Sequence, residues 1–112
     1  MRNEHGIEGE IQSKGLNAPR LTPESIDATI VSEDYHQFAG TTLIICALTL
    51  KNGFIVTGES RPAHDGNFDE ELGRKIARAN AREKIWPLEG YVLRHRLGPV
   101  LTINNAEIGV IG

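Results

Sequence analysis

The clearest pattern of hydrophobic and polar positions lies between residues 41 and 60. Two runs of mostly aliphatic and β-branched residues, Thr41–Leu50 and Phe54–Ser60, flank the dipeptide Asn52-Gly53. Asn-Gly adopts positive φ at both central positions of a type I′ turn, whose twist matches that of paired strands. The sequence therefore predicts an antiparallel β-hairpin with a two-residue loop, in which Cys46 lies opposite Glu59.

Both faces of the first predicted strand are apolar. One face carries Thr42, Ile44, Cys46, Leu48 and Leu50, and the other carries Leu43, Ile45 and Ala47. A strand with two apolar faces needs a cover on each face, and one helical layer from a short chain covers only one. An isolated hairpin is also marginally stable. We therefore expect the second face to be covered by the C-terminal segment or by another subunit, and we predict a homo-oligomer.

A short helix is predicted before the hairpin. Thr22 is a good N-cap residue, and Pro23 suits the first helical position because its missing N–H has no helical partner there. Ile26 and Ile30 then form one apolar stripe at helical spacing. The pattern predicts a helix that ends near Glu33.

A long helix is predicted after the hairpin. Asn67 is the expected cap, with acidic residues following it at the positive end of the helix dipole. Leu72, Ile76 and Asn80 recur every fourth residue, which predicts the face that packs against the sheet. Gly73 and Ala77 lie beside that face.

Pro87 interrupts this helix. Proline donates no backbone N–H and disfavours helical geometry at the preceding residue. The helix should therefore kink or stop at Ile85–Trp86, and a second helix should run from Pro87 through Leu97. Gly98 is a natural stop signal.

These elements predict an α+β fold with three segments. Residues 1–20 show no lasting period and are expected to be mostly mobile. Residues 21–98 form a single α+β domain. Residues 99–112 are a C-terminal extension that reads as two short strands joined by a turn at Asn104-Asn105.

The amino-acid composition limits the classes of function that are possible for this chain. A chain of 112 residues suits one domain, and 39 % apolar with 24 % charged residues is ordinary for a soluble protein. A net charge of −3 disfavours a nucleic-acid-coating protein. A single cysteine allows no internal disulfide, and no apolar run is long enough to span a bilayer or resembles a signal peptide. We expect a protein that stays inside the cell and does not enter a membrane.

Catalytic chemistry is weakly indicated. The chain contains no Walker loop, dinucleotide fingerprint, metal-binding Cys/His array or nucleophile elbow. The histidines are scattered, and His64-Asp65 lies in a Gly/Pro-containing loop where a solvent-exposed pair is the expected state. Cys46 among Ile and Leu is read as a buried hydrophobe. We expect no enzyme activity, no metal and no cofactor.

Asn80 and the basic residues of the long helix are the first candidates for binding. Asn80 on a packing face either bonds to neighbouring backbone or reads the polar edge of a ligand, because a buried amide needs a partner. Arg78 and Arg82 have no acidic residue four positions before them, and Arg94 follows in the second helix. Arginine binds phosphate with paired donors, whereas the alternative is a solvated helix face.

Aromatic residues and one carboxylate complete the set of candidates. Phe68 and Trp86 are placed to pack the core, and either can instead stack a base. The hydroxyl of Tyr91 needs a polar partner. Glu59, at the end of the second strand, either accepts a hydrogen bond from a ribose hydroxyl or caps the helices.

An ordered series of motifs resembles a family of small tailed-phage proteins that includes the type-one Thoeris anti-defence proteins. The motifs run through Gly40-Thr41-Thr42, Leu48-Thr49-Leu50-Lys51-Asn52-Gly53-Phe54, Thr57-Gly58-Glu59-Ser60, Asn67-Phe68-Asp69, Gly73-Arg74-Lys75-Ile76-Ala77, Asn80-Ala81 and Lys84-Ile85-Trp86-Pro87-Leu88-Glu89-Gly90-Tyr91. The resemblance covers about residues 33 to 97. The loop Arg61–Gly66 and the segment after Leu97 match no motif.

The resemblance implies a protein that acts in the cytoplasm of the infected bacterial host. It implies binding, without degradation, of a cyclic ADP-ribose-type signal made by a TIR-domain enzyme, and in some members of cyclic oligonucleotides at a second site. It also implies dimers, which assemble into hexamers in some members. The residues that we expect to contact the ligand are Phe68, Arg78, Asn80, Arg82, Trp86 and Arg94. Glu59 and Tyr91 are the next candidates. The alternative function is an interaction module that inhibits a host protein by docking through the apolar sheet face.

Overall fold

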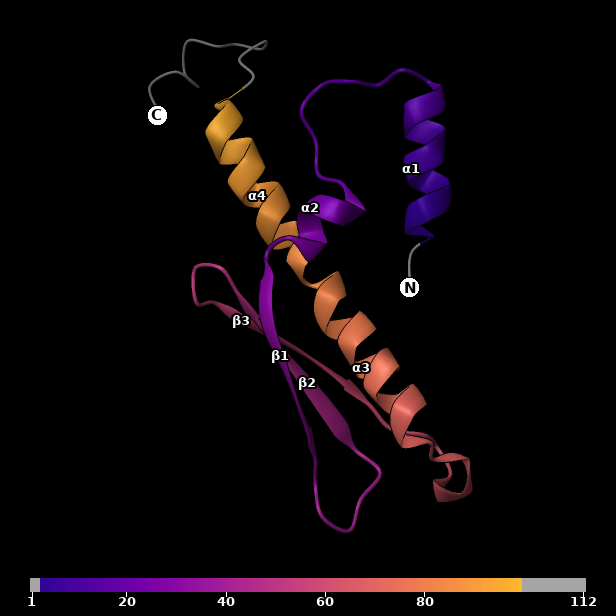
Figure 1. Cartoon of the computed structure of the whole chain (residues 1–112). Coiled ribbons are helices and arrows are strands. Elements are labelled where there is room, and N and C mark those ends of the chain that lie inside the picture. Colours follow the sequence, from indigo (N-terminus) through magenta and orange to yellow (C-terminus); the bar gives the residue numbers. More distant parts are fainter. Residues whose placement is uncertain (1–2, 100–112) are drawn as a thin grey trace.

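The computed structural model describes residues 3–99 and has the predicted α+β architecture (Figure 1). A three-stranded antiparallel sheet in the order β1-β2-β3 is covered on one face by a long helix. The two strands predicted between Val100 and Gly112 lie outside the described residues. The elements in chain order are α1 (Glu4–Ser13), α2 (Pro23–Asp27), β1 (Ile30–Gln37), β2 (Ile44–Leu50), β3 (Ile55–Ser60), the 3-10 turn η1 (Asp65–Asn67), α3 (Glu70–Glu83) and α4 (Ile85–Leu97).

Strand β1 occupies a segment in which the sequence predicted helix. The predicted start is confirmed, since Thr22 caps α2 and Pro23 is its first residue. The predicted end near Glu33 is wrong, because α2 stops at Asp27 and β1 begins at Ile30. In β1, Tyr35 lies opposite Cys46. Pairing along the whole length of β2 outweighs the weak helical pattern of this segment, as tertiary context commonly does.

The hairpin is present, but its predicted register is wrong by one residue. The Leu50 N–H donates to the Phe54 carbonyl at 2.8 Å, so the loop has three residues and not two. Within the loop only Gly53 has positive φ, at 90°, whereas a type I′ turn requires positive φ at both central positions. Cys46 therefore lies opposite Gly58 and not Glu59. The one-residue shift moves Glu59 to the opposite face of the sheet.

Helix α3 packs on the sheet through its smallest residues. Gly73, Ala77 and Ala81 are its buried positions, whereas Leu72 is 54 % and Ile76 40 % exposed. The predicted packing face of Leu72, Ile76 and Asn80 is therefore wrong, and Asn80 too is exposed. The core beneath α3 consists of Ile26, Ile44, Cys46, Leu48, Leu50, Val56, Ala77, Ala81 and Ile85.

Gly58 in β3 explains this choice of face. A Cβ atom at Gly58 would lie 2.2 Å from the backbone nitrogen of Ala81 and 2.4 Å from the carbonyl oxygen of Ala77. The helix backbone thus lies against the strand backbone, which only glycine allows. Close contact requires alanine and glycine at the contact points of the helix and moves the larger residues to its flanks.

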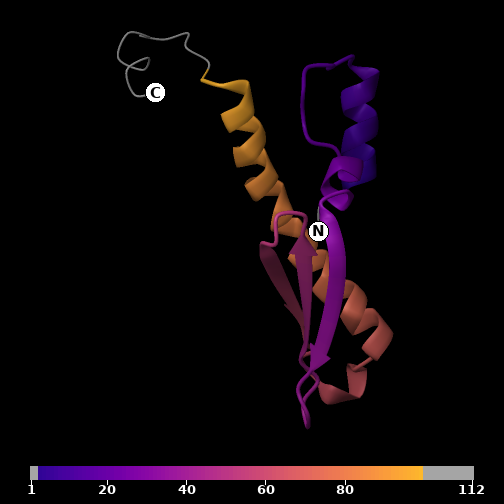
Figure 2. The ribbon, with the colours of Figure 1, turned by 60° about the vertical axis from the view of Figure 1, so that its left-hand side comes forward.

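The second face of the sheet has no cover among the described residues. Leu43, just before β2, and Ile45 and Ala47 on β2 are only half-buried. Figure 2 shows α3 on one side of the sheet with the other side open. The C-terminal segment, which the sequence offers as one possible cover for this face, lies outside the residues that the structure describes. The predicted homo-oligomer stays a prediction.

The helical region begins and breaks slightly away from its predicted positions. Asp69, and not Asn67, caps α3 by accepting from the Leu72 N–H at 2.9 Å, while Asn67 belongs to η1. The break falls at Lys84, which ends α3 and precedes α4. Pro87 is then the third residue of α4, in the first turn, where its missing N–H costs no helical hydrogen bond. The predicted end at Leu97 is confirmed, and Gly98 has φ of 78°.

The N-terminal segment contains a helix that the sequence did not predict. Residues Glu4–Ser13 form α1 within the segment 1–20, and the expected mobility of that segment stays a prediction. The helix has no buried residue. The two terminal guanidinium nitrogens of Arg20 each donate to the Glu8 carboxylate at 2.6 Å, which joins α1 to the chain before α2.

This ion pair predicts a measurable shift in titration. The Arg20 hydrogen bonds, with a further bond from Gln12, lower the pKa of Glu8 from 4.5 to about 2. A lowered folded-state pKa contributes stability above the unfolded pKa, and this is lost as pH falls toward 2. The Glu8 carboxyl ¹³C shift, followed by NMR, should have its midpoint near pH 2. In Arg20→Gln the midpoint should return toward 4.5, and a wild-type midpoint near 4.5 would contradict the ion pair.

Candidate functional site

The structure divides the predicted site residues among three places. Helix α3 separates a flank facing β1 from a flank facing the free edge of β3, and α4 extends past the end of the sheet near α2 (Figure 1). The β1 flank carries Arg78 and Arg82, and Trp86 follows them in the first turn of α4. The β3 flank carries Glu59, Phe68 and Asn80. Tyr91 and Arg94 lie on α4.

Arg78 on the β1 flank is held by β1. Its Nε donates to Glu33 Oε2 at 3.0 Å, across 45 residues of sequence. Glu33 also accepts from the Tyr35 hydroxyl at 2.7 Å, and these hydrogen bonds, that of Tyr35 first, lower the pKa of Glu33. Arg78 is therefore an ion-paired residue that joins α3 to the sheet, and not part of a solvated helix face.

Arg82 and Trp86 meet the N-terminal helix. Arg82 Nε donates to Asp27 at 2.7 Å, and its terminal nitrogens donate to Glu4 and to the Pro23 carbonyl. The Trp86 indole N–H donates to the same Glu4 carboxylate at 3.1 Å. Arg82 is only 14 % exposed. The two predicted ligand contacts thus join α1, α2 and the helical region.

Asn80 and Glu59 meet at the free edge of the sheet. In an antiparallel ladder, hydrogen-bonded and non-hydrogen-bonded residue pairs alternate. Leu50 and Phe54 form a hydrogen-bonded pair, so Ile45 and Glu59 form a non-hydrogen-bonded pair, and the backbone N–H and C=O of Glu59 point away from β2. Asn80 Nδ2 donates to the Glu59 carbonyl at 2.9 Å. The bond to neighbouring backbone considered for Asn80 is therefore present. Its amide oxygen accepts no hydrogen bond from the described residues.

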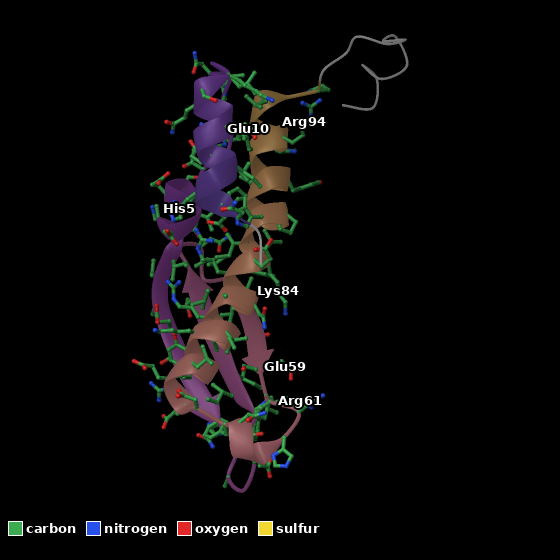
Figure 3. The ribbon with its side chains drawn as sticks, turned by 90° about the vertical axis from the view of Figure 1, so that its right-hand side faces the viewer. His5, Glu10, Glu59, Arg61, Lys84 and Arg94 are labelled. Atoms are coloured by element: carbon green, nitrogen blue, oxygen red, sulfur yellow. The ribbon has the colours of Figure 1, made fainter. Side chains whose placement is uncertain are left out.

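A groove runs along this edge from Asn80 to Phe68. It consists of two hollows of about 370 and 140 Å³, which share Ser60, Arg61 and Ile76. Figure 3 shows Glu59 and Arg61 on the same side of the molecule beside α3. The residues that line the groove include Glu59, Arg61, Phe68, Leu72, Ile76 and Asn80.

The groove offers four kinds of contact to a nucleotide-like ligand. Half-buried Phe68 presents a ring, and Leu72 and Ile76 form an apolar wall. The Asn80 amide suits polar edges, and Arg61 suits phosphate oxygens. Glu59 contributes its backbone carbonyl, which accepts from Asn80, while its side chain lies on the open face of the sheet with Ile45. Sequence reasoning missed Arg61, because its loop matched no motif. The available signal was an arginine two residues after Glu59, at the end of the strand.

Tyr91 and Arg94 are not part of the groove. Tyr91 is 75 % exposed, and both residues line a separate hollow near the end of α4 with His95, Gly98 and Pro99. Figure 3 places Arg94 at the opposite end of the molecule from Glu59 and Arg61. One chain therefore brings together three of the eight predicted residues in its edge groove.

Other chemistry is limited in the described part of the chain. Cys46 is fully buried in the core, and burial raises the pKa of its thiol. Across residues 3–99, no three His, Cys, Asp or Glu side chains are grouped to hold a metal ion. No helix in the same range has the length and apolar character needed to cross a membrane.

Comparison with known proteins gives one family. The model of the phage protein (N4 Gp49/phage Sf6 gene 66) family matches residues 21–97, which run from the residue before the Thr22 cap to the last residue of α4. No curated protein and no solved structure matches the chain. The matched range contains the sheet, the edge groove and both long helices, and it leaves out α1.

Proposed function

This chain belongs to the phage protein (N4 Gp49/phage Sf6 gene 66) family, and from that premise we propose that it is an anti-defence protein. It binds a cyclic ADP-ribose-type immune signal in the cytoplasm of the infected bacterial host and holds it without degrading it. The immune effector that this signal would activate then receives no signal. The proposal extends the motif series of the sequence, which resembles that of the type-one Thoeris anti-defence proteins.

The observation that carries the proposal is the edge groove. The sequence predicts that Phe68, Asn80 and Glu59 contact such a signal, and these residues line the two adjoining hollows of the groove, which share Arg61. In this proposal an adenine ring stacks on Phe68, its polar edge meets the Asn80 amide, and the pyrophosphate meets Arg61. Arg78, Arg82 and Trp86 have a structural role, because their donors hold Glu33, Asp27 and Glu4.

Release of intact ligand distinguishes sequestration from catalysis. The protein is mixed with a cyclic ADP-ribose-type signal, separated from free ligand by filtration, and then heated. We expect the released molecule to have the unchanged mass and to reactivate a TIR-pathway effector. A cleaved product would mean an enzyme, and failure to retain either this signal or a cyclic dinucleotide would overturn the proposal.

Phe68→Ala tests the place of binding. A base–aromatic stack contributes about 1–3 kcal/mol, so this change should weaken binding about tenfold or more in isothermal titration calorimetry. Phe38→Ala is the matched control, because Phe38 is 43 % exposed at the end of β1 and lies outside the groove. Equal affinities of wild type and Phe68→Ala would place the ligand elsewhere.

The second candidate function is docking onto a host protein. The half-buried apolar residues Leu43, Ile45 and Ala47 on the open sheet face favour it. A pull-down from host lysate separates the two functions when it is combined with mass analysis of bound small molecules. A stoichiometric protein partner that is lost in Ile45→Glu, with no nucleotide retained, would support docking in place of sequestration.

A further inference from the structure

Charged side chains join the N-terminal helix α1 to the rest of the described chain. The helix has 10 residues, none of them buried, and Figure 1 shows it away from the sheet. A helix of this length is marginal in water unless one of its faces is packed. Two of its carboxylates, Glu4 and Glu8, form ion pairs with Arg82 and Arg20. A competing charge can therefore displace α1.

The Glu4 carboxylate lies where donors from two other helices converge. Its Oε2 atom accepts from a terminal nitrogen of Arg82, on α3, and also from the Trp86 indole N–H, on α4, at 3.1 Å. Two donors aimed at one oxygen atom are the arrangement of an anion-binding site. Arg82 is held in this position by Asp27 and the Pro23 carbonyl as well, and neither belongs to α1.

The same place has room for a ligand. A hollow of about 430 Å³ lies beside Glu4, between the start of α1 and α3. Its wall carries three cations, Lys75, Arg78 and Arg82, and two carboxylates, Glu4 and Glu83. Once Glu4 leaves, three cations face one carboxylate. The hollow therefore favours a negatively charged occupant.

The family match separates the two sides of this contact. Arg82 and Trp86 lie within the matched residues 21–97, whereas Glu4 lies before them. The donors therefore belong to the family domain, and the carboxylate that occupies them comes from outside the matched range. A carboxylate in this position acts as an internal competitor of any anion that these donors bind.

We infer that Arg82 and Trp86, which hold α1 in this structure, also form a site for a phosphate monoester, and that Glu4 covers this site until the ligand displaces α1. Glu4 is tethered, so it acts at a high effective concentration that a free anion with one charge does not overcome. A phosphate monoester carries about −1.5 to −2 charges at pH 7 and three acceptor oxygens, so it outcompetes one carboxylate. The phosphate groups of cyclic signals carry one charge each and do not. The site shares no lining residue with the edge groove, and it is independent of the proposed function.

Titration of the full chain with methyl phosphate, followed by Trp86 fluorescence, tests the site. We expect Glu4→Gln to bind at least about tenfold more tightly than wild type, because a neutral amide holds Arg82 less strongly than a carboxylate does. Glu10→Gln is the matched control, because Glu10 lies on the same helix, pairs with Lys14 and is 70 % exposed, and it should keep the wild-type affinity. Absence of binding by Glu4→Gln, or equal affinities of wild type and Glu4→Gln, would overturn the inference.

Two variants in the Glu4→Gln background locate the phosphate. Arg82→Gln should lower the affinity at least about tenfold, since charge-assisted hydrogen bonds are the strong ones. Arg74→Gln removes the same charge from the same helix outside the hollow and should leave the affinity unchanged. Circular dichroism checks that both variants are folded. Equal losses in both would mean that the charge of α3 as a whole attracts the phosphate, and the site would be wrong.

Hydrogen exchange of wild type tests the displacement of α1 without any substitution. At saturating methyl phosphate, the amides of residues 4–13 should exchange faster, because a displaced α1 has no packed face to keep it helical. Dimethyl phosphate, with one charge, and sodium chloride at the same ionic strength should leave their exchange unchanged. Unchanged exchange in α1 with methyl phosphate bound, or equal acceleration by dimethyl phosphate, would overturn the inference.

Discussion

Replacing Gly58 by alanine is expected to destabilise the protein by about 3 kcal/mol, the upper end of what overpacking usually costs. The added Cβ would lie 2.2 Å from a backbone nitrogen of α3 and 2.4 Å from a backbone oxygen. Backbone atoms in a packed helix do not move aside as a flexible side chain does. The helix must therefore shift away from β3, which opens the contacts of Ala77 and Ala81 with the core.

Urea denaturation followed by circular dichroism measures this effect, and two other glycines provide a scale. A Cβ at Gly9 meets nothing within 4 Å, so Gly9→Ala in α1 should be neutral or slightly stabilising. A Cβ at Gly73 meets the end of the Ile44 side chain at 2.9 Å. The loss of unfolding free energy in Gly73→Ala should therefore lie between those of Gly9→Ala and Gly58→Ala. A loss under about 0.5 kcal/mol for Gly58→Ala, the size of an ordinary surface effect, would show that the strand and the helix are not in direct contact.

Replacing Arg82 by alanine is expected to cost about 3 kcal/mol and to free α1. Removing one member of a buried ion pair typically costs about 3–5 kcal/mol, and the lower end applies because Asp27 is 57 % exposed. The change leaves Glu4 and Asp27 without their shared cation. Trp86 is the only tryptophan and donates to Glu4. Its fluorescence should then show that the surroundings of the indole ring have become more polar.

Arg74→Ala is the matched control for this prediction, because Arg74 lies two turns earlier on the same helix. Arg74 pairs with Glu70 at 3.3 Å with both side chains half exposed, and it lies over the Tyr35 ring. Such contacts contribute less than about 1 kcal/mol. Unfolding free energies and Trp86 spectra should separate the two variants. Equal losses in both would mean that the Glu4–Arg82–Asp27 cluster does not hold α1.

The elements that could be predicted from sequence have local causes. The Thr22 cap, the two strands around Asn52-Gly53, the break before Pro87 and the stop at Gly98 each depend on the conformation of a few neighbouring residues. The hairpin register could not be read in this way, because Asn-Gly fits both a two-residue turn and a three-residue loop with positive φ at Gly53 alone. One hydrogen bond of Leu50 decides between them.

The sequence predicted which types of residue the candidate site contains, but it did not predict which of them lie together in the structure. Phe68, Asn80 and Glu59 line one groove, while Arg78 and Arg82 of the same predicted set form ion pairs on the other flank of α3. The sequence showed that these two arginines lack partners four residues before them. It could not show that Glu33, Asp27 and Glu4 would supply those partners, because the partners come from strands and helices far away in the chain.

The sequence by itself determined where the hairpin strands lie, where α2 begins and where α4 ends, because caps, turns and proline act within a few residues. The tertiary structure alone decided that residues 30–37 form a strand and which side of α3 is buried. Hydrophobicity favoured the stripe of Leu72 and Ile76, yet Gly73, Ala77 and Ala81 face the sheet. The physical reason is Gly58: a backbone-to-backbone contact between β3 and α3 admits only the smallest side chains, and it moves the larger apolar residues to the flank, where they line the edge groove.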